Sequence, residues 1–320
     1  MEIAPGIHRL DAPLGARVCA TYLLVGSATV VLVDTGVAGT IAGGVLPYLG
    51  SIGVEMDRLR LILITHADVD HNGDTAAAKD AFPRALLACH RDDAAEIDDL
   101  ETMITRRYGE FVADHGIADP PATQAWVREV GKPAPVDLLL TGGERLRLEP
   151  GWEVELLHTP GHSRGHLTVW DPRSRAAIIA DAALWRTLVS PAGAPVFPPT
   201  YRYIDAYRGS IARLEALRPE WLLTSHFPTM RGDAAMAFLA ESLAYTEQVE
   251  SVLLARLAGG PLTTVELIQA AGSDLGPWPI DETLPALAFP VVGHLERFAA
   301  VGAIRQERNA SGLVTWHVAA

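Results

Sequence analysis

Short apolar runs alternate with helix-like segments along the first 230 residues of the chain. The first run is followed by Gly26-Ser27, a typical hairpin signal. The pattern predicts early strands at residues 18–25, 28–33, 59–65 and 85–89, with helices at 41–49 and 74–81. A second series of strands is expected at 138–140, 152–157, 167–170, 176–180 and 221–225, with a helix at 203–217. Two series of strands surrounded by helices predict an α/β fold, a sandwich with helices outside two sheets.

Two other segments have a different pattern. Residues 91–135 look helical but irregular, because Pro120-Pro121 interrupts them and their start is strongly acidic. A solvated helix face explains such charge, and an active-site lid is the alternative. In residues 233–320 the hydrophobic pattern predicts helices at 233–257, 263–271 and 283–301, followed by a hairpin at 303–308 and 313–318. We therefore expect an α/β domain at 1–232 with an insert at 91–135, and a C-terminal module at 233–320.

Charge and composition narrow the classes of function. The chain has 320 residues with 26 basic and 39 acidic side chains, so its net charge is 26 − 39 = −13. Such a surface repels polyphosphates, so nucleic acid and anionic membranes are disfavoured as partners. No apolar segment is long enough to span a membrane, and the N-terminus lacks a signal-peptide pattern. Cys19 and Cys89 cannot form a disulfide framework, so we expect a cytoplasmic protein. Since nucleic acid and membranes are disfavoured as partners, we expect a small-molecule substrate.

Four residues with metal-binding side chains follow the strand predicted at 59–65. They are His66, Asp68, Asp70 and His71. A strand end followed by a turn can direct alternate side chains into one cleft. Imidazole nitrogens and carboxylate oxygens are ligands for Zn²⁺, Mn²⁺ or Fe²⁺. The alternative for this segment alone is that these residues cap the next helix.

Three later residues favour the metal site. His162 lies in a Gly/Pro turn at 158–166 after a strand, and Asp181 directly follows the apolar run 176–180. His226 follows the apolar run that begins at Trp221. Each position places a metal-binding side chain at the carboxyl end of a buried strand, which packing alone does not explain.

The order of these motifs resembles the metallo-β-lactamase superfamily, whose His-x-His-x-Asp-His motif is followed by His, Asp and His. The match covers roughly residues 1–230 and includes Val33-Asp34-Thr35-Gly36 and the phrase at 158–166. The resemblance implies an αββα sandwich of two mixed sheets. The C-terminal module resembles the winged-helix-like extension found on one branch of that superfamily.

The resemblance also implies two divalent metal ions, with zinc expected first and manganese or iron left open. One metal would be held by His66, Asp68 and His162. The second would be held by Asp70, His71 and His226, and Asp181 would bridge the two. A hydroxide between the metals would be the nucleophile. Asp70, besides binding metal, would orient that hydroxide and pass a proton to the leaving group.

Asp68 departs from the family pattern, because it stands where the family usually has His. An additional negative charge favours harder metals, Mn²⁺ or Fe²⁺, over Zn²⁺. Flavodiiron proteins have a carboxylate at this position, so a di-iron site stays open. The alternative is that Asp68 turns away and leaves one metal weakly held. We favour ligation.

The resemblance implies a metal-dependent hydrolase of a small ester, lactone, thioester or related acyl substrate. Trp185 and Tyr201 follow the bridging Asp181 and are our candidate substrate contacts. Tyr108, Phe111 and Trp126 are candidates for the opposite wall. The alternatives are a single-strand endoribonuclease, which the net charge opposes, and a di-iron or mono-iron oxygen-dependent enzyme. A binding protein with a degenerate site and a homodimer also stay open.

Overall fold

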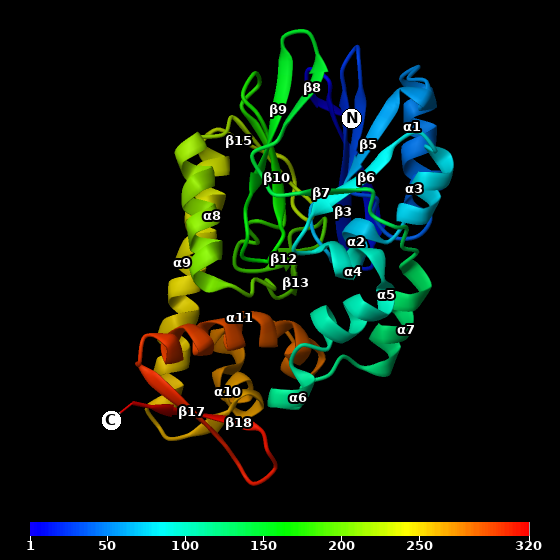
Figure 1. Ribbon diagram of the computed structural model, residues 1–320. Coiled ribbons are helices and arrows are strands. Elements are labelled where there is room, and N and C mark those ends of the chain that lie inside the picture. Colours follow the sequence, from blue (N-terminus) through cyan, green and yellow to red (C-terminus); the bar gives the residue numbers. More distant parts are fainter. Residues whose placement is uncertain (320) are drawn as a thin grey trace.

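The structure is a computed structural model that describes residues 1–319, and two β-sheets form its centre (Figure 1). The first sheet has seven strands that follow one another in chain order. Its first four strands are antiparallel neighbours, and its last four are parallel. In order they are β1 (Glu2–Ala4), β2 (Ile7–Leu14), β3 (Arg17–Val25), β4 (Val30–Val33), β5 (Leu59–Leu63), β6 (Leu86–His90) and β7 (Leu138–Leu140).

The second sheet has six strands. Only the pair β11–β14 is parallel, and the other neighbours are antiparallel. Across the sheet the strands are β15 (Met230–Arg231), β14 (Trp221–Thr224), β11 (Ala176–Ala180), β10 (Leu167–Asp171), β9 (Trp152–His158) and β8 (Arg145–Glu149). Both sheets are mixed, as the αββα architecture requires.

Alternating side chains of the strands separate the layers of the molecule. Val33 and Ile178 belong to the apolar cluster between the two sheets, whereas Leu32 belongs to the cluster beneath the helices of the first sheet. This alternation follows from the period of two along a strand. The helices on that side are η1 (Ile41–Val45), α1 (Leu46–Ser51), η2 (Met56–Arg58) and α3 (Thr75–Ala81). The second sheet is covered by α8 (Ile204–Leu217), beside which α9 (Asp233–Leu257) runs (Figure 1).

Residues 91–135 form a group of short helices between β6 and β7. They are α4 (Ala94–Asp98), α5 (Leu100–Thr102), η3 (Met103–Tyr108), α6 (Val112–His115) and α7 (Pro121–Val130). The segment η3 is a π-helix. Val69, which follows Asp68, packs with residues of this group in a small apolar cluster of its own. The insert therefore lies against the predicted metal-binding segment.

The C-terminal segment shares an apolar cluster with the outer face of the second sheet. That cluster contains Leu157 of β9, Ile211 of α8 and Phe298 near the end of the chain. The elements of this segment are β16 (Leu262–Thr263), α10 (Thr264–Ala271), η4 (Gly272–Asp274), α11 (Ile280–Ala300), β17 (Ile304–Arg308) and β18 (Val314–Val318). The predicted helices and hairpin are present, and β16 adds a third strand at the β18 edge. The winged-helix likeness stays a prediction.

One strand is placed differently from the expectation. The sequence pattern put residues 138–140 in the second series, but β7 pairs in parallel with β6 in the first sheet. The reason is that the chain returns from the insert to the edge where it left. The pattern also missed β8, because its arginine and glutamate side chains are partly exposed at a sheet edge. Among residues 1–319, no helix combines the length and the apolar character needed to cross a membrane.

Candidate metal centre

The seven predicted ligands converge at the ends of strands from both sheets. His66 lies just beyond β5, Asp181 directly follows β11, and His226 lies just beyond β14. Asp70 and His71 are held together by the single turn of α2 (Val69–Asn72). Strand ends from two sheets therefore bring together side chains that are up to 160 residues apart along the chain, since 226 − 66 = 160.

One half of the cluster consists of His66, Asp68 and His162, whose donor atoms lie within 4.8 Å of one another. The Asp68 Oδ2 atom is 2.7 Å from His162 Nε2 and 3.7 Å from His66 Nε2. We call this group the His66 half. It is the group that the resemblance assigns to the first metal.

The other half, which we call the His71 half, consists of Asp70, His71 and His226. His226 Nε2 is 3.4 Å from Asp70 Oδ2, and His71 Nε2 is 3.9 Å from the same oxygen. Asp181 Oδ2 lies 3.3 Å from His226 Nε2, 3.8 Å from His71 Nε2 and 4.0 Å from His162 Nε2. Asp181 is therefore placed between the halves, where the resemblance puts the bridging ligand.

Hydrogen bonds at Nδ1 fix three of the four imidazole rings, whereas His162 Nδ1 is buried without a partner among the described residues. His71 Nδ1 is 2.8 Å from Asp34 Oδ2, and His226 Nδ1 is 2.8 Å from the Val18 carbonyl oxygen. His66 Nδ1 is 3.0 Å from Thr65 Oγ1. The Nε2 atoms of His66 and His71 are buried and have no hydrogen-bond partner among the described residues. Such rings, held by Nδ1 with Nε2 directed inward, fit a divalent cation.

Two residues of the site have left-handed backbone conformations, which residues with a Cβ atom rarely adopt. Asp34 has a φ of 62°, and Ala180, next to Asp181, has a φ of 42°. A left-handed conformation costs about 1–2 kcal/mol for a residue with a Cβ atom. Asp34 uses its position to accept bonds from the Thr65 amide, at 2.7 Å, and the Thr65 hydroxyl, at 2.8 Å. Such strain persists where the surrounding structure holds functional groups in place.

Burial and neighbouring charges separate the pKa values of two adjacent histidines. Burial, together with the nearby His71, lowers the pKa of His66 to about 4. Burial also opposes the charged form of His71, but the carboxylates of Asp70 and Asp34 raise its pKa to about 10. His66 is therefore neutral near pH 7, and a cation bound by His71 would displace a proton from that imidazole.

Arg107 is the main functional residue that the sequence analysis missed. Its Nε atom donates to Asp68 Oδ1 at 2.9 Å, and its Nη2 atom donates to Asp68 Oδ2 at 3.1 Å. The same Nη2 atom is 3.2 Å from His162 Nε2. Burial would raise the pKa of Asp68, but Arg107 and His162 hold it well below its ordinary value. The charge of Asp68, at a position usually occupied by His, was the available signal that a cation lies nearby.

Cys19 is a second residue with unexpected surroundings. Its side chain is buried and forms no disulfide. However, its thiol lies with Asp70, His71 and His226 in one group of possible ligands. Its Sγ atom donates to the Asp70 carbonyl oxygen at 3.1 Å. Burial raises the pKa of this thiol well above its ordinary value, and Asp70 raises it further.

A cavity of about 220 Å³ opens onto the ligands. Its walls come from the insert, from the loop around Phe197 and from α11, so distant parts of the chain enclose it. The wall of the insert includes Tyr108 and Trp126, as predicted, whereas Phe111 is buried against Phe289. The other lining residues include Arg17, Asp119, Val127, Leu188, Phe197, Pro285, Ala286 and Phe289.

The two aromatic residues predicted to contact substrate do not line this cavity, and that expectation is corrected. Tyr201 is fully buried, its ring stacks on Tyr207, and its hydroxyl lies 3.1 Å from His294 Nε2. Trp185 faces a different surface hollow, and its indole Nε1 donates to Glu241 at 2.5 Å. Tyr201 thus packs against Tyr207 of α8, and Trp185 bonds to Glu241 of α9.

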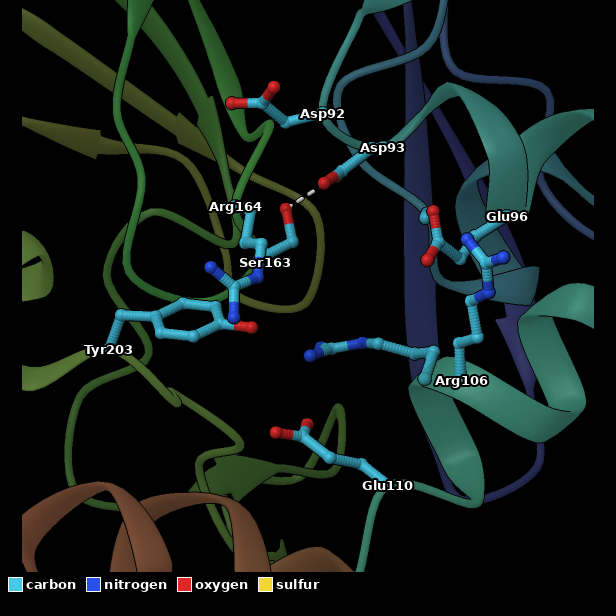
Figure 2. A pocket seen from close by; sticks show the side chains of 10 residues that line it. Asp92, Asp93, Glu96, Arg106, Glu110, Ser163, Arg164 and Tyr203 are labelled. Carbon is cyan, nitrogen blue, oxygen red and sulfur yellow. Dashed lines mark hydrogen bonds between the residues drawn. The ribbon is translucent and has the colours of Figure 1, made fainter. Parts of the chain in front are cut away.

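The remaining histidines of the 158–166 turn, His158 and His166, make hydrogen bonds within the protein. His166 Nε2 accepts a bond from the Asp181 amide at 3.2 Å, and His158 Nε2 donates to the Arg164 carbonyl at 2.8 Å. Figure 2 shows how Asp93 holds the same turn through Ser163, at 2.6 Å. Asp93 also accepts a bond from the Gly165 amide. The insert therefore anchors the loop that carries His162.

A family model for the metallo-beta-lactamase superfamily matches residues 14–226, which contain all seven predicted ligands. The chain belongs to the metallo-beta-lactamase superfamily. Members of this superfamily are metal-dependent hydrolases, so the predicted enzyme class and the predicted sandwich fold are confirmed. A comparison with curated proteins found no significant match.

Solved structures of metallo-beta-lactamase proteins resemble the whole chain. One is a metallo-beta-lactamase family protein of Thermus thermophilus, with a TM-score of 0.77 and 23% identity over 99% of this chain and 100% of that chain. Another is a beta-lactamase domain protein of Burkholderia ambifaria, with a TM-score of 0.76 and 18% identity over 100% of this chain and 94% of that chain. A stereoselective inverting sec-alkylsulfatase of a Pseudomonas species has a TM-score of 0.60 and 19% identity over 93% of this chain and 49% of its own. These likenesses show a shared fold.

Proposed function

We propose that the protein hydrolyses a small ester, lactone, thioester or related acyl substrate with a divalent metal held by the His/Asp cluster. The observation that carries this proposal is a cavity lined by Asp70, Asp181 and His226. Beside it lies the buried His71 Nε2 atom, 3.9 Å from Asp70 Oδ2 and 3.8 Å from Asp181 Oδ2, with no hydrogen-bond partner among the described residues. Zinc is the metal we expect, with manganese and iron as alternatives. A bound cation of this kind lowers the pKa of water and polarises a carbonyl group.

Asp70 has the position needed for proton transfer. Its side chain is 14% exposed, and it lines the cavity, whereas the imidazoles beside it are buried. A carboxylate facing both the nucleophile and the bound substrate can take a proton from one and give it to the leaving group. We therefore assign this role to Asp70. His71 and His226 hold their positions through Asp34 and the Val18 carbonyl.

The cavity favours a compact substrate with an apolar part. The cavity has a volume of about 220 Å³, which is below the usual range of pockets for drug-sized ligands. Its apolar surface comes from Trp126, Val127, Phe197 and Phe289. Arg17 lies over the Phe197 ring at 4.6 Å and forms no ion pair within the described residues. A substrate that carries one negative group beside its acyl group would therefore find a cation at the rim.

The test is a hydrolysis assay on the full chain. Metal-free protein is loaded separately with Zn²⁺, Mn²⁺ or anaerobic Fe²⁺ and assayed against aryl esters, lactones, thioesters and a β-lactam. We expect metal-dependent hydrolysis of at least one acyl class, lost on chelation and restored by the metal. Cleavage of a fluorescent RNA oligomer alone, or oxygen uptake without hydrolysis, would overturn the proposal in favour of the other functions.

A further inference from the structure

The His66 half of the metal centre already contains a cation, the guanidinium of Arg107. Its Nη2 atom lies 3.1 Å from Asp68 Oδ2 and 3.2 Å from His162 Nε2. These are two of the three donor atoms that a metal in this half would need. A metal ion in this half would therefore have to displace the Arg107 guanidinium from Asp68 and break the contact of 2.7 Å between Asp68 Oδ2 and His162 Nε2.

The contacts of Arg107 keep its guanidinium in place. Nε and Nη2 form a two-pronged pair with Asp68, which is the strongest arrangement for arginine and carboxylate. Nη1 donates to the His162 carbonyl at 3.1 Å, and the guanidinium carbon lies 4.6 Å from the centre of the Phe289 ring. The side chain is only 8% exposed. Moving it would leave a buried charge unpaired, which is strongly unfavourable.

An aspartate at position 68 suits the pairing with Arg107. A carboxylate accepts two parallel N–H bonds from arginine, whereas an imidazole offers one acceptor nitrogen at most. Asp68 therefore suits Arg107 better than the histidine that the family usually has at this position. Asp68 and Arg107 lie 39 residues apart, and the π-helix η3 of the insert delivers the arginine.

The His71 half has no such cation. Its charged neighbours are the carboxylates of Asp70, Asp181 and Asp34, and no lysine or arginine forms an ion pair with Asp70 or Asp181 within residues 1–319. His71 Nε2 and Asp181 Oδ1 are buried without hydrogen-bond partners in the described part of the chain. The donor set of this half therefore fits a divalent cation. In the His66 half, His66 Nε2 and His162 Nδ1 are also buried without partners, but both Asp68 oxygens bond to Arg107, so that half lacks a free carboxylate for a second metal.

We propose that this enzyme binds one metal ion, through Asp70, His71, Asp181 and His226, and that Arg107 supplies the positive charge that a second metal provides in two-metal relatives. The inference rests on the proposed function only in taking the His/Asp cluster to bind metal. In this arrangement Asp68 is the partner of Arg107 and not a ligand. Arg107 acts as a positioning residue that holds Asp68 and His162 beside the metal.

The experiment counts metal ions in the full chain. Metal-free protein is reloaded with Zn²⁺ or Mn²⁺ and desalted, the metal per chain is measured by mass spectrometry, and the affinity is measured by calorimetry. We expect one tightly bound equivalent in the wild type. Arg107→Met frees the donors of the His66 half, so we expect a second equivalent to bind at least tenfold more tightly than in the wild type. Asp68→Asn should keep one equivalent.

Arg106→Met is the matched control. Arg106 is the neighbouring arginine in η3 and lines the hollow shown in Figure 2 with Glu96 and Glu110, but within residues 1–319 it forms no hydrogen bond or ion pair with Asp68 or His162. This variant should bind one equivalent, as the wild type does. Circular dichroism and thermal melting establish that each variant is folded. If Arg107→Met does not fold, the wild-type count and the Asp68→Asn count still decide.

The outcomes separate this inference from the proposed function. Two tight equivalents in the wild type, falling to one in Asp68→Asn, would overturn the inference, and metal-dependent acyl hydrolysis in the same sample would leave the function intact. One equivalent without hydrolysis of any acyl class would support the inference and count against the function.

Discussion

The two halves of the metal centre contain the same kinds of donor but have different surroundings. Each half has two imidazoles and one carboxylate of its own, and Asp181 lies near both halves. Arg107 lies against the His66 half, whereas carboxylates surround the His71 half. Donor residues therefore define where a cation can bind, and their neighbours decide whether the cation is a metal ion or a side chain. The following predictions test this difference.

The largest effect is expected at Asp70. Asp70→Asn removes the carboxylate that takes and gives the proton, so kcat should fall by about 10²–10⁴-fold on the acyl substrate identified above. The side chain faces the cavity, so the fold should remain intact by circular dichroism. Near-wild-type turnover in a folded variant would contradict the assigned role.

Metal affinity should depend on the hydrogen bonds that hold the histidines of the His71 half, and not on those of the His66 half. Asp34→Asn disturbs the bond to His71 Nδ1, and such losses typically weaken metal binding by about 10–100-fold. Ser163→Ala removes the bond to Asp93 that holds the turn carrying His162, and it serves as the comparison for the His66 half. We expect it to leave affinity essentially unchanged, as measured by competition with a chromophoric chelator. Equal losses in the two variants would indicate that both halves bind metal.

Thermal stability should report the same asymmetry. A ligand present at 100 times its dissociation constant stabilises the folded state by about 2.7 kcal/mol. The wild type should therefore melt at a lower temperature after chelation. His71→Ala should lose this metal-dependent shift, whereas His66→Ala should keep most of it, in scanning calorimetry with and without metal. The reverse ranking would place the metal in the His66 half.

The smallest effects concern the cavity walls. Trp126→Ala should raise KM several-fold with little change in kcat, because its side chain borders the cavity and is not beside the ligands. Tyr201→Phe should leave both constants unchanged and lower the free energy of unfolding by about 1 kcal/mol, through loss of the bond to His294. Steady-state kinetics and denaturant titration of both variants give the comparison. A raised KM in Tyr201→Phe would restore it as a substrate contact.

Much of the fold could be predicted because strands and helices carry local patterns. The helix 233–257 and the strands 138–140 and 176–180 have the predicted bounds. The sheet to which β7 belongs could not be predicted, since pairing is a long-range property. Edge strands such as β8 lack the continuous apolar run that marks buried strands.

The clustering of the seven candidate residues could be predicted because they lie beyond the ends of strands, and those strand ends meet at one edge of the sandwich. The approach of Arg107 to Asp68 could not, because it depends on how an irregular insert folds back over 39 residues. The prediction that Trp185 and Tyr201 border the cavity did not hold for a related reason. Their distance from Asp181 along the chain is short, but packing against α8 and α9 turns them away from the cavity.

Phe289 shows that the last part of the chain takes part in the chemistry of the first. It belongs to α11, outside the residues 14–226 that the family model matches, yet its ring lies against the Arg107 guanidinium and lines the cavity. Substitutions along this helix can therefore reshape substrate selectivity while every ligand stays unchanged. The same contact makes the tail an integral wall, so a shortened protein ending at residue 232 would lose part of its pocket together with its core.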